Sequence, residues 1–320
     1  MEQSKQPIPS YKNDFLDWLE IEKGLNSKSQ ENYSRFLEKF LTWLKKNKLE
    51  NLKPHELSPV YVRQYRIYLA REISPNTKKT LKKTTQNYYL VALRSLLNFF
   101  ADRDILSLPS DKIKLPKDKN VRAVDFLSPD QIKQLLEAPD TSKIWGLRDK
   151  AILEIFFSTG MRIAELLGLN REQIKLKPDT KSLEIRIVGK GSRPRPVYFS
   201  ENAVYWLRQY IEARDRQKEA LQEKALFMNF KNKKSDNHRL SPRTVQTSIK
   251  RYAIIAGVPI TITPHVMRHT FATHMLSEGV DLRTLQEFLG HKNITATQIY
   301  THVTSKRLRD IHHKIHDNGN

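Results

Sequence analysis

The chain has 320 residues, enough for one large or two ordinary domains, and 56 Lys and Arg against 35 Asp and Glu give a formal net charge of +21. This charge predicts a polyanionic partner, while 13 Phe, 12 Tyr and 4 Trp supply a folded core and exclude a disordered basic tail. The lack of Cys excludes disulfides, a thiolate nucleophile and Cys-ligated metals. Since no leader-like segment and no run of about 20 apolar residues is found, we expect a protein that is neither secreted nor membrane-spanning.

The N-terminal part is predicted to be helical, because its apolar residues recur at helical spacing and strand-like alternation is rare. We expect four helices. The first contains Phe15, and the second begins at Ser27, which we expect to form a capping box with Gln30. The third follows Pro59, and the fourth extends to Phe100. A dense basic stretch between these last two helices contains Lys78, Lys79, Lys82 and Lys83.

Residues 108–125 are predicted to link two domains. They contain two Pro and five Lys or Arg, and they lack a regular apolar pattern. We therefore expect a helical domain over residues 1–107 and a second domain over residues 126–320.

Two helices are predicted near the start of the second domain. One should begin at Ser128-Pro129, and another should run from about Leu147 to Thr159. Gly160 follows and can adopt the left-handed conformation that ends a helix.

A small antiparallel sheet is predicted next. Apolar and charged residues alternate over 183–187, and a Gly-rich turn then leads to a second apolar stretch at 197–199. Residues 174–176 are a candidate third strand. The expected fold class is therefore mostly α with a small antiparallel β-sheet, in two domains.

Cations, imidazoles and a phenol in five short segments of the second domain would together serve a reaction on a phosphodiester. Considered alone, each is better explained as an ordinary surface or structural residue. The hypothesis of an active site depends on their combination. The residues are Arg162, Lys190, His265, Arg268, His291 and Tyr300.

A Thr-Pro pair directly before His265 predicts a helix start that would attract a phosphate. Arg268 would lie on the same helix face, three residues on. The helix dipole favours the neutral imidazole of His265, which could then accept a proton. His269 and His274 are better explained as structural histidines in the core.

Gly290 is predicted to end a helix, after which a loop would present His291, and a short following helix would carry Tyr300. The sequence contains neither a phosphate-binding P-loop motif nor a carboxylate cluster for two magnesium ions. The histidines near the C-terminus lack the Cys partners of common zinc sites. We therefore expect no metal and no cofactor.

Four segments closely resemble, in order and spacing, the signature boxes of the tyrosine recombinases, specifically the Xer and phage-integrase branch. They are residues 160–165 (Gly-Met-Arg-Ile-Ala-Glu), 265–269 (His-Val-Met-Arg-His), 289–291 (Leu-Gly-His) and 297–302 (Thr-Gln-Ile-Tyr-Thr-His). No catalytic position is missing, and Met267 stands where Leu is more usual, a change that conserves volume. The first half of the chain resembles the family's core-binding domain more weakly.

The resemblance implies a DNA-clamping architecture, with a helical core-binding domain and an α+β catalytic domain. It also implies site-specific recombination, in which a 3′-phosphotyrosyl intermediate forms and strands are exchanged through a Holliday junction. The energy of the broken bond is kept in that intermediate, so neither ATP nor a metal is needed.

Attack on a phosphodiester builds negative charge on its non-bridging oxygens, and two fixed guanidiniums would stabilise this charge. Arg162 and Arg268 are the candidates, because a lysine could not replace their bidentate fork. His291 would donate a hydrogen bond to a phosphate oxygen. Glu165 lies about one turn beyond Arg162 and is predicted to orient an arginine or histidine.

Tyr300 would be the nucleophile, and with an ordinary phenol pKa of about 10 it needs a proton acceptor. His265 is the candidate for this acceptor. Lys190 lies at the expected hairpin turn among cations such as Arg193, which favour release of its proton. It is the candidate general acid for the departing 5′ oxygen.

Both halves of the chain carry excess positive charge, so both should contact double-stranded DNA, at a specific recombination site. The candidate DNA contacts are Lys78, Lys79, Lys82, Lys83 and Arg193. A solvated basic face is the alternative explanation of the lysines. The DNA substrate implies a cytoplasmic, nucleoid-associated protein.

The last predicted helix, about residues 305–316, has a short apolar stripe and must dock to be stable. Packing within its own subunit is as compatible with the sequence as donation to a neighbour. The resemblance favours donation in trans, within a tetramer assembled on two sites. An accessory translocase or a second recombinase could join this assembly.

Two other functions stay open, and so does the biological role of recombination. A type IB topoisomerase would use the same tyrosine chemistry and reseal the original strand. A DNA-binding protein without catalysis would use the same cations only for phosphate contacts. Within recombination, resolution of chromosome or plasmid dimers and integration of mobile elements would both fit.

Overall fold

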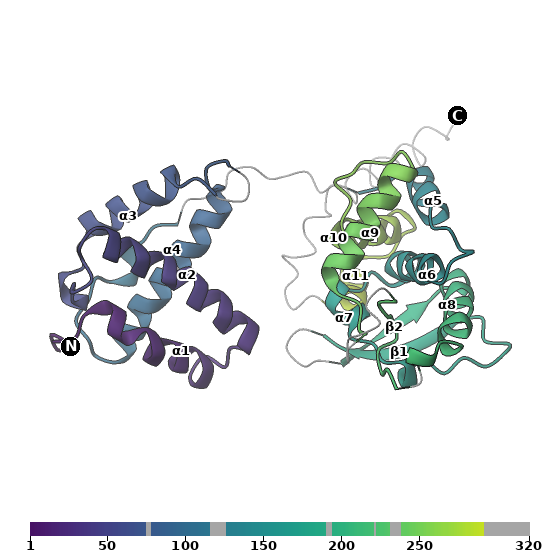
Figure 1. The fold of residues 1–320 in the computed structure, drawn as a ribbon, viewed down its shortest axis with the longest axis horizontal. Helices are drawn as coiled ribbons and strands as arrows, with labels where there is room; N and C mark the ends of the chain where they lie inside the picture. The colour runs from purple at the N-terminus through teal and green to yellow at the C-terminus, as the bar shows by residue number, and fades with distance from the viewer. Residues whose placement is uncertain (75–77, 116–125, 190–193, 221, 231–237, 291–320) are drawn as a thin grey trace, which may run out of the picture. The chain divides into compact units, whose positions relative to one another are not determined.

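In a computed structural model of the chain, two compact units are separated after Arg122. They are Met1–Arg122 and Ala123–Asn320 (Figure 1). The structure describes residues 1–74, 78–115, 126–189, 194–220, 222–230 and 238–290. Among these residues no helix is long and apolar enough to cross a membrane.

The first unit contains the four predicted helices, which enclose a core rich in aromatic rings. Phe15, Phe40, Tyr65 and Phe100 are fully buried in it. The ring of Tyr65 meets that of Phe40 edge-on, with 5.0 Å between centroids, an arrangement that adds to the energy of burial. The helices are α1 (Lys12–Ile21), α2 (Ser27–Lys46), α3 (Pro59–Arg71) and α4 (Lys83–Asp102).

The predicted cap of α2 is wrong by one residue. Asn26, not Ser27, is the N-cap, and its side chain accepts a hydrogen bond of 2.9 Å from the backbone N–H of Ser29. The Gln30 amide donates instead to the carbonyl of Leu25. Asn is at least as good an N-cap as Ser, and here it comes first in the chain.

The start of the predicted linker packs on the first unit. Ser110–Lys112 form a short 3₁₀ helix, and Ile113 is buried in the first core. Residues 116–125 lie outside the described residues. Other single turns of 3₁₀ helix are Ile8–Tyr11, Pro54–Glu56, Arg171–Gln173 and Lys218–Ala220.

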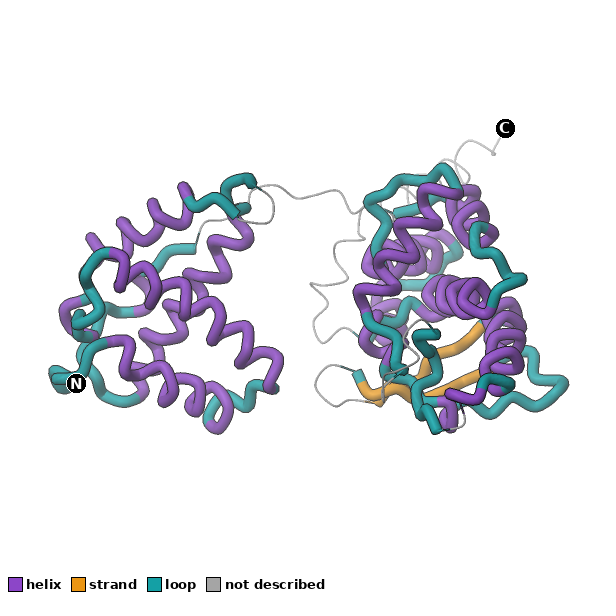
Figure 2. Tube along the Cα trace, viewed as in Figure 1, coloured by secondary structure: helices purple, strands orange, loops and turns teal. Residues whose placement is uncertain are grey.

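The second unit packs helices against one face of a two-stranded sheet (Figure 2). Helix α6 is central, because it contacts α8, α10 and strand β2. Even its charged residues are buried, with Arg148 paired to Asp149 at 2.6 Å and Lys150 to Glu154 at 2.9 Å. The helices are α5 (Pro129–Glu137), α6 (Ile144–Thr159), α7 (Ile163–Leu167), α8 (Glu201–Asp215), α9 (Pro242–Ile255), α10 (Pro264–Ser277) and α11 (Leu282–Leu289).

The sheet confirms the predicted antiparallel hairpin. Strands β1 (Leu183–Val188) and β2 (Pro194–Phe199) pair with Ile185 opposite Val197. The predicted third strand at 174–176 is wrong, because Ile174 follows a 3₁₀ turn and enters the core without pairing to the sheet. Ile174 is therefore buried by packing beside a turn, and not by membership of a strand.

Two predicted helix boundaries are confirmed. Ser128 caps α5 in a reciprocal box, in which its hydroxyl accepts from the N–H of Gln131 and the Gln131 side chain accepts from the N–H of Ser128. Gly160 ends α6 in the left-handed conformation, at φ +58°. The chain then turns directly into α7, which carries Arg162 at its N-cap and Glu165 in its first turn.

Candidate active site

Three arginines from three different elements meet at the C-terminal end of α11. Arg195 on β2, Arg268 on α10 and Arg162 at the N-cap of α7 donate to three successive carbonyls. Arg195 donates to the carbonyl of Phe288 at 3.3 Å. Arg268 donates to that of Leu289 at 2.6 Å, and Arg162 to that of Gly290 at 3.4 Å. The last carbonyls of a helix lack partners within it and carry the negative end of its dipole, so cations are favoured here.

Gly290 ends α11 as predicted, in the left-handed conformation at φ +63°. A Cβ at this position would stand 2.8 Å from Cδ of Arg195. Leu285 and Leu289 hold the helix against Phe271 and Leu276 of α10. The end of α11 is therefore fixed by packing on one side and by guanidiniums on the other.

Glu165 is the carboxylate that organises two of these arginines. It accepts from Arg195 through both terminal nitrogens, at 2.9 and 2.8 Å, and from the side chain and backbone of Arg162, each at 2.9 Å. Burial would raise the pKa of the Glu165 carboxyl, but the hydrogen bonds from Arg195 and Arg162 outweigh it and lower that pKa from 4.5 to about 2. Glu165 is thus ionised at neutral pH, as an orienting carboxylate must be.

Arg268 is buried, with 5% of its surface exposed. One terminal nitrogen donates to the carbonyl of Gly160 and the other to that of Leu289, both at 2.6 Å. Arg268 therefore connects the turn before α7 to the end of α11.

The start of α10 follows the sequence prediction. Thr263 is the N-cap and accepts from the N–H of Val266 at 3.2 Å. His265 is exposed in the first turn, and His269 is half-buried, with a pKa lowered by burial, by His265 and by Arg268. The prediction that His274 lies in the core is wrong, because it is exposed and stacks on Phe157 with 5.6 Å between ring centroids.

The structure thus brings Arg162, Glu165 and Arg268 together, with His265 on the same helix as Arg268. Four predicted residues lie outside the described residues. They are Lys190 and Arg193, between β1 and β2, and His291 and Tyr300, which follow α11 in the sequence.

Arg195 was missed by sequence reasoning. It is 9% exposed and shares the inward face of β2 with Val197 and Phe199. The available signal was a charged residue at an apolar position of an alternating strand, which implies a buried partner.

Two of the predicted DNA-contacting lysines lie at the start of α4, and the other two lie just before it. Lys78, Lys79, Lys82 and Lys83 are exposed, and Lys82 is the N-cap of the helix. A neighbouring groove between α3 and α4 is lined by Arg63, Arg66 and Lys112, which the sequence did not single out. Together these side chains give the first unit a basic surface.

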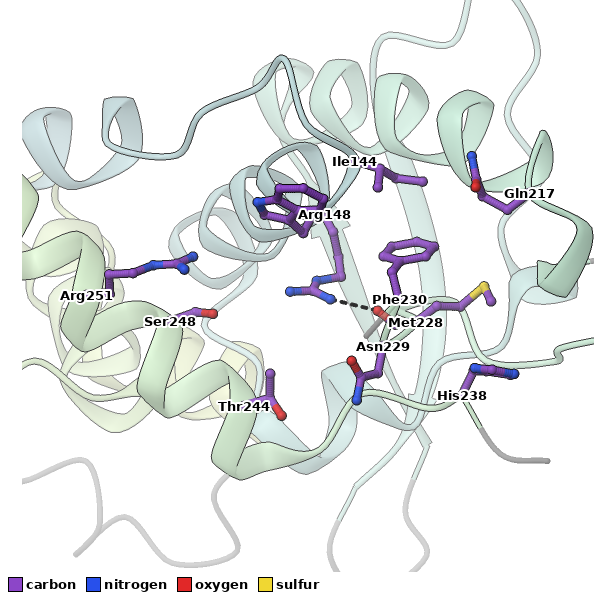
Figure 3. A pocket seen from close by; sticks show the side chains of 11 residues that line it. Ile144, Arg148, Gln217, Met228, Asn229, Phe230, His238, Thr244, Ser248 and Arg251 are labelled. Atoms are coloured by element: carbon purple, nitrogen blue, oxygen red, sulfur yellow. Dashed lines mark hydrogen bonds between the residues drawn. The ribbon is translucent and has the colours of Figure 1, made fainter. Parts of the chain in front are cut away.

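The second unit also contains a cavity of about 490 Å³ (Figure 3), whose lining residues include none of the three clustered arginines. Arg148 projects into it and donates to the Met228 carbonyl at 2.8 Å, while its other nitrogens bond Asp149. The residues that line the cavity include none of the predicted site residues. Arg148 therefore has a structural role, because it connects α6 to the segment that contains Met228.

Comparison with known proteins gives consistent results for both units. The phage integrase family matches residues 125–307, and the phage integrase N-terminal SAM-like domain matches residues 13–104. The chain is 33% identical to tyrosine recombinase XerD of Lacticaseibacillus casei, over 96% of this chain and 98% of that protein. It is 36% identical to tyrosine recombinase XerC of Thermodesulfovibrio yellowstonii, over 96% of each.

Solved structures agree on the fold. A crystal structure of XerH bound to its palindromic difH substrate, a post-cleavage complex, superposes with a TM-score of 0.74 at 20% identity, over 98% of each chain. XerA recombinase gives a TM-score of 0.51 at 28% identity, over 97% of this chain and 99% of that one.

Proposed function

The chain belongs to the phage integrase family, and from this membership we infer that it is a site-specific tyrosine recombinase, which breaks and rejoins DNA at recombination sites. One observation in the structure supports this activity most directly. Arg162 and Arg268 are both fixed at the end of α11, immediately before His291 in the sequence. Two oriented guanidiniums are suited to the charge that builds up on a phosphodiester under attack.

We propose that Arg162 and Arg268 bind the scissile phosphate and stabilise its transition state, with Glu165 orienting Arg162. His291 would donate to a phosphate oxygen. The two arginines are already held by a carboxylate and by backbone carbonyls before DNA binds. Their guanidiniums therefore need little reorganisation during the reaction.

We propose further that Tyr300 attacks the phosphate and that His265, exposed at the start of α10, takes its proton. Lys190 would protonate the departing 5′ oxygen. The product would be a 3′-phosphotyrosyl link with a free 5′ hydroxyl, and its resolution by a partner strand would form a Holliday junction. No cofactor or metal is assigned to these steps.

A nicked suicide duplex tests the nucleophile. The site is first selected from a random DNA library, and a nick near the scissile phosphate then traps the covalent intermediate. Wild-type protein should form a covalent adduct in the presence of EDTA, and Tyr300→Phe should form none, since only the phenol oxygen can make the ester. Tyr198→Phe, which alters an exposed tyrosine of β2, is the matched control and should form the adduct normally. An adduct that persists in Tyr300→Phe would disprove the assignment.

Two assays on the same preparation distinguish recombination from its alternatives. A type IB topoisomerase would relax a supercoiled plasmid without exchanging strands between two sites. A DNA-binding protein without catalysis would form no adduct. The recombinase should exchange strands between two copies of the selected site.

We propose that the basic surface of the first unit, with Lys78, Lys79, Lys82 and Lys83, contacts the duplex backbone, and that Arg193 does so from the second unit. Work on chromosomal or plasmid DNA would place the protein at the nucleoid. Dimer resolution and mobile-element integration both fit this activity. The position of the selected site in the genome would distinguish these two roles.

We propose that the segment 305–316 docks on a second copy of the chain, within a tetramer on two sites. A groove of about 900 Å³ between α5, α6, α8 and α10 is a suitable acceptor. Its apolar lining includes Phe126, Leu127, Ile132, Leu136, Phe157 and Trp206. The segment offers Leu308, Ile311 and Ile315 at helical spacing on an otherwise basic sequence.

Truncation after Thr304 should leave binding to a single site intact and abolish recombination between two sites, because the docking residues are lost. Gel shifts measure the binding, and a two-site plasmid assay measures the recombination. Truncation after His316, which keeps the apolar residues, is the matched control and should recombine normally. Normal recombination by the shorter protein would contradict the proposed docking.

A further inference from the structure

Arg195 is a buried cation that donates three hydrogen bonds to two residues in two other segments of the second unit. It donates through both terminal nitrogens to Glu165 and through Nε to the carbonyl of Phe288. Its side chain is 9% exposed and that of Glu165 is 6% exposed, so this ion pair is removed from water.

A charge at this position is costly for the fold alone. The neighbouring inward residues of β2 are Val197 and Phe199, and an apolar side chain in place of Arg195 would pack with them. Burying a guanidinium costs several kcal/mol unless its donors are matched, and a well-packed apolar residue is often at least as stabilising. The fold therefore does not explain why this strand carries an arginine.

The contacts of Arg195 do suggest a reason. Through Glu165 it orients Arg162, which binds the same carboxylate. Through Phe288 it fixes the end of α11, three residues before His291 in the sequence. Arg195 itself, the second residue of β2, follows Lys190 by five residues in the sequence.

Close packing against Gly290 fixes the direction of the Arg195 side chain. The missing Cβ of Gly290 leaves room for the stem of Arg195, with its Cδ at 2.8 Å from where that Cβ would stand. The planar fork of Arg195 then matches the two oxygens of Glu165, a geometry that a lysine ammonium cannot reproduce.

We propose that Arg195 is a positioning residue for the recombination reaction, which holds β2, Glu165 and the end of α11 in one fixed arrangement. This inference depends on the proposed function. Arg195 acts through Arg162 and through the residues that follow α11, and it needs no contact with DNA. A small displacement of catalytic groups is enough to slow a reaction strongly.

The test separates DNA binding from cleavage in Arg195→Lys, which keeps the charge and loses the fork. Single-turnover cleavage of the nicked suicide duplex is measured at saturating protein, and the Kd for the same duplex by gel shift. We expect the cleavage rate constant to fall by about 100-fold, while the Kd changes by less than about threefold. Arg171→Lys is the control for loss of an arginine–carboxylate pair away from the site, because Arg171 pairs with Asp215 at a partly exposed position and its replacement should leave both quantities unchanged.

A double variant tests whether Arg195 and Glu165 act as one unit. Arg195→Lys combined with Glu165→Gln should cleave no more slowly than the slower single variant. If Arg195→Lys does not fold, as judged by circular dichroism, Arg195→Gln is measured in the same way with the same expectations.

Three results would overturn the inference: cleavage by Arg195→Lys within about threefold of wild type, a Kd weakened as much as cleavage, or effects of the two substitutions that multiply. Each presupposes a wild-type adduct that depends on Tyr300. Failure of the wild type to form that adduct would overturn the proposed function instead, so the two failures are distinguishable.

Discussion

Replacement of Arg268 by lysine is expected to slow DNA cleavage by about 1,000-fold, the upper range for loss of one donor to a developing oxyanion. The buried guanidinium reaches the carbonyls of Gly160 and Leu289, both at 2.6 Å. A lysine has its three donors on one nitrogen and cannot span these two carbonyls and a phosphate together. Single-turnover cleavage of the nicked suicide duplex measures the loss.

Arg148→Lys is the matched control for this substitution. Arg148 is as buried as Arg268, at 5% exposure, and it is bonded to Asp149 and to the Met228 carbonyl. Each lysine variant should lose about 1–3 kcal/mol of stability through unsatisfied partners. Only Arg268→Lys should lose cleavage in folded, DNA-bound protein, and equal cleavage by the two variants would contradict the role of Arg268.

Gly160→Ala is expected to destabilise the second unit by about 3 kcal/mol, through left-handed strain and overpacking. Gly160 lies at φ +58°, and an added Cβ would stand 2.4 Å from Cδ1 of Phe271. For a unit of this size the melting temperature should fall by about 10 °C. Cleavage should also slow, by about 100-fold, because the Gly160 carbonyl holds Arg268 and the next turn carries Arg162.

Gly257→Ala separates strain from crowding. Gly257 lies at φ +65°, but a Cβ there would meet nothing within 4 Å. This variant should lose only about 1 kcal/mol and should cleave like wild type. Equal melting temperatures for the two alanine variants would show that Phe271 can move aside without cost.

Local signals predicted the four helices of the first unit, α5, α6, the start of α10 and the end of α11, but they did not predict α8 and α9. The Ser128 box, the Thr263 cap and the glycines at 160 and 290 depend on residues within one turn, so the sequence contains the whole interaction. The cap at Asn26 was missed because two good capping residues are adjacent. Residues 174–176 were mistaken for a strand because burial next to a turn produces the same apolar pattern.

The candidate site was predictable only in part, for a physical reason. The signature boxes led to Arg162, Glu165 and Arg268, because the resemblance marks residue types at fixed spacing. Arg195 has partners 30 and 93 residues away along the chain, and no local pattern reports such contacts. The contacts to the carbonyls at the end of α11 could not be predicted from the sequence either, since any residue can supply a backbone oxygen.

The charged pairs buried along α6 have a practical consequence for handling the protein. Arg148–Asp149 and Lys150–Glu154 are shielded from solvent, so dissolved ions screen their attraction only weakly. Binding to nucleic acid, by contrast, weakens steeply as the salt concentration rises, because the release of counterions from the phosphates then yields less free energy. A concentrated salt wash should therefore strip bound nucleic acid during purification while the catalytic unit stays folded.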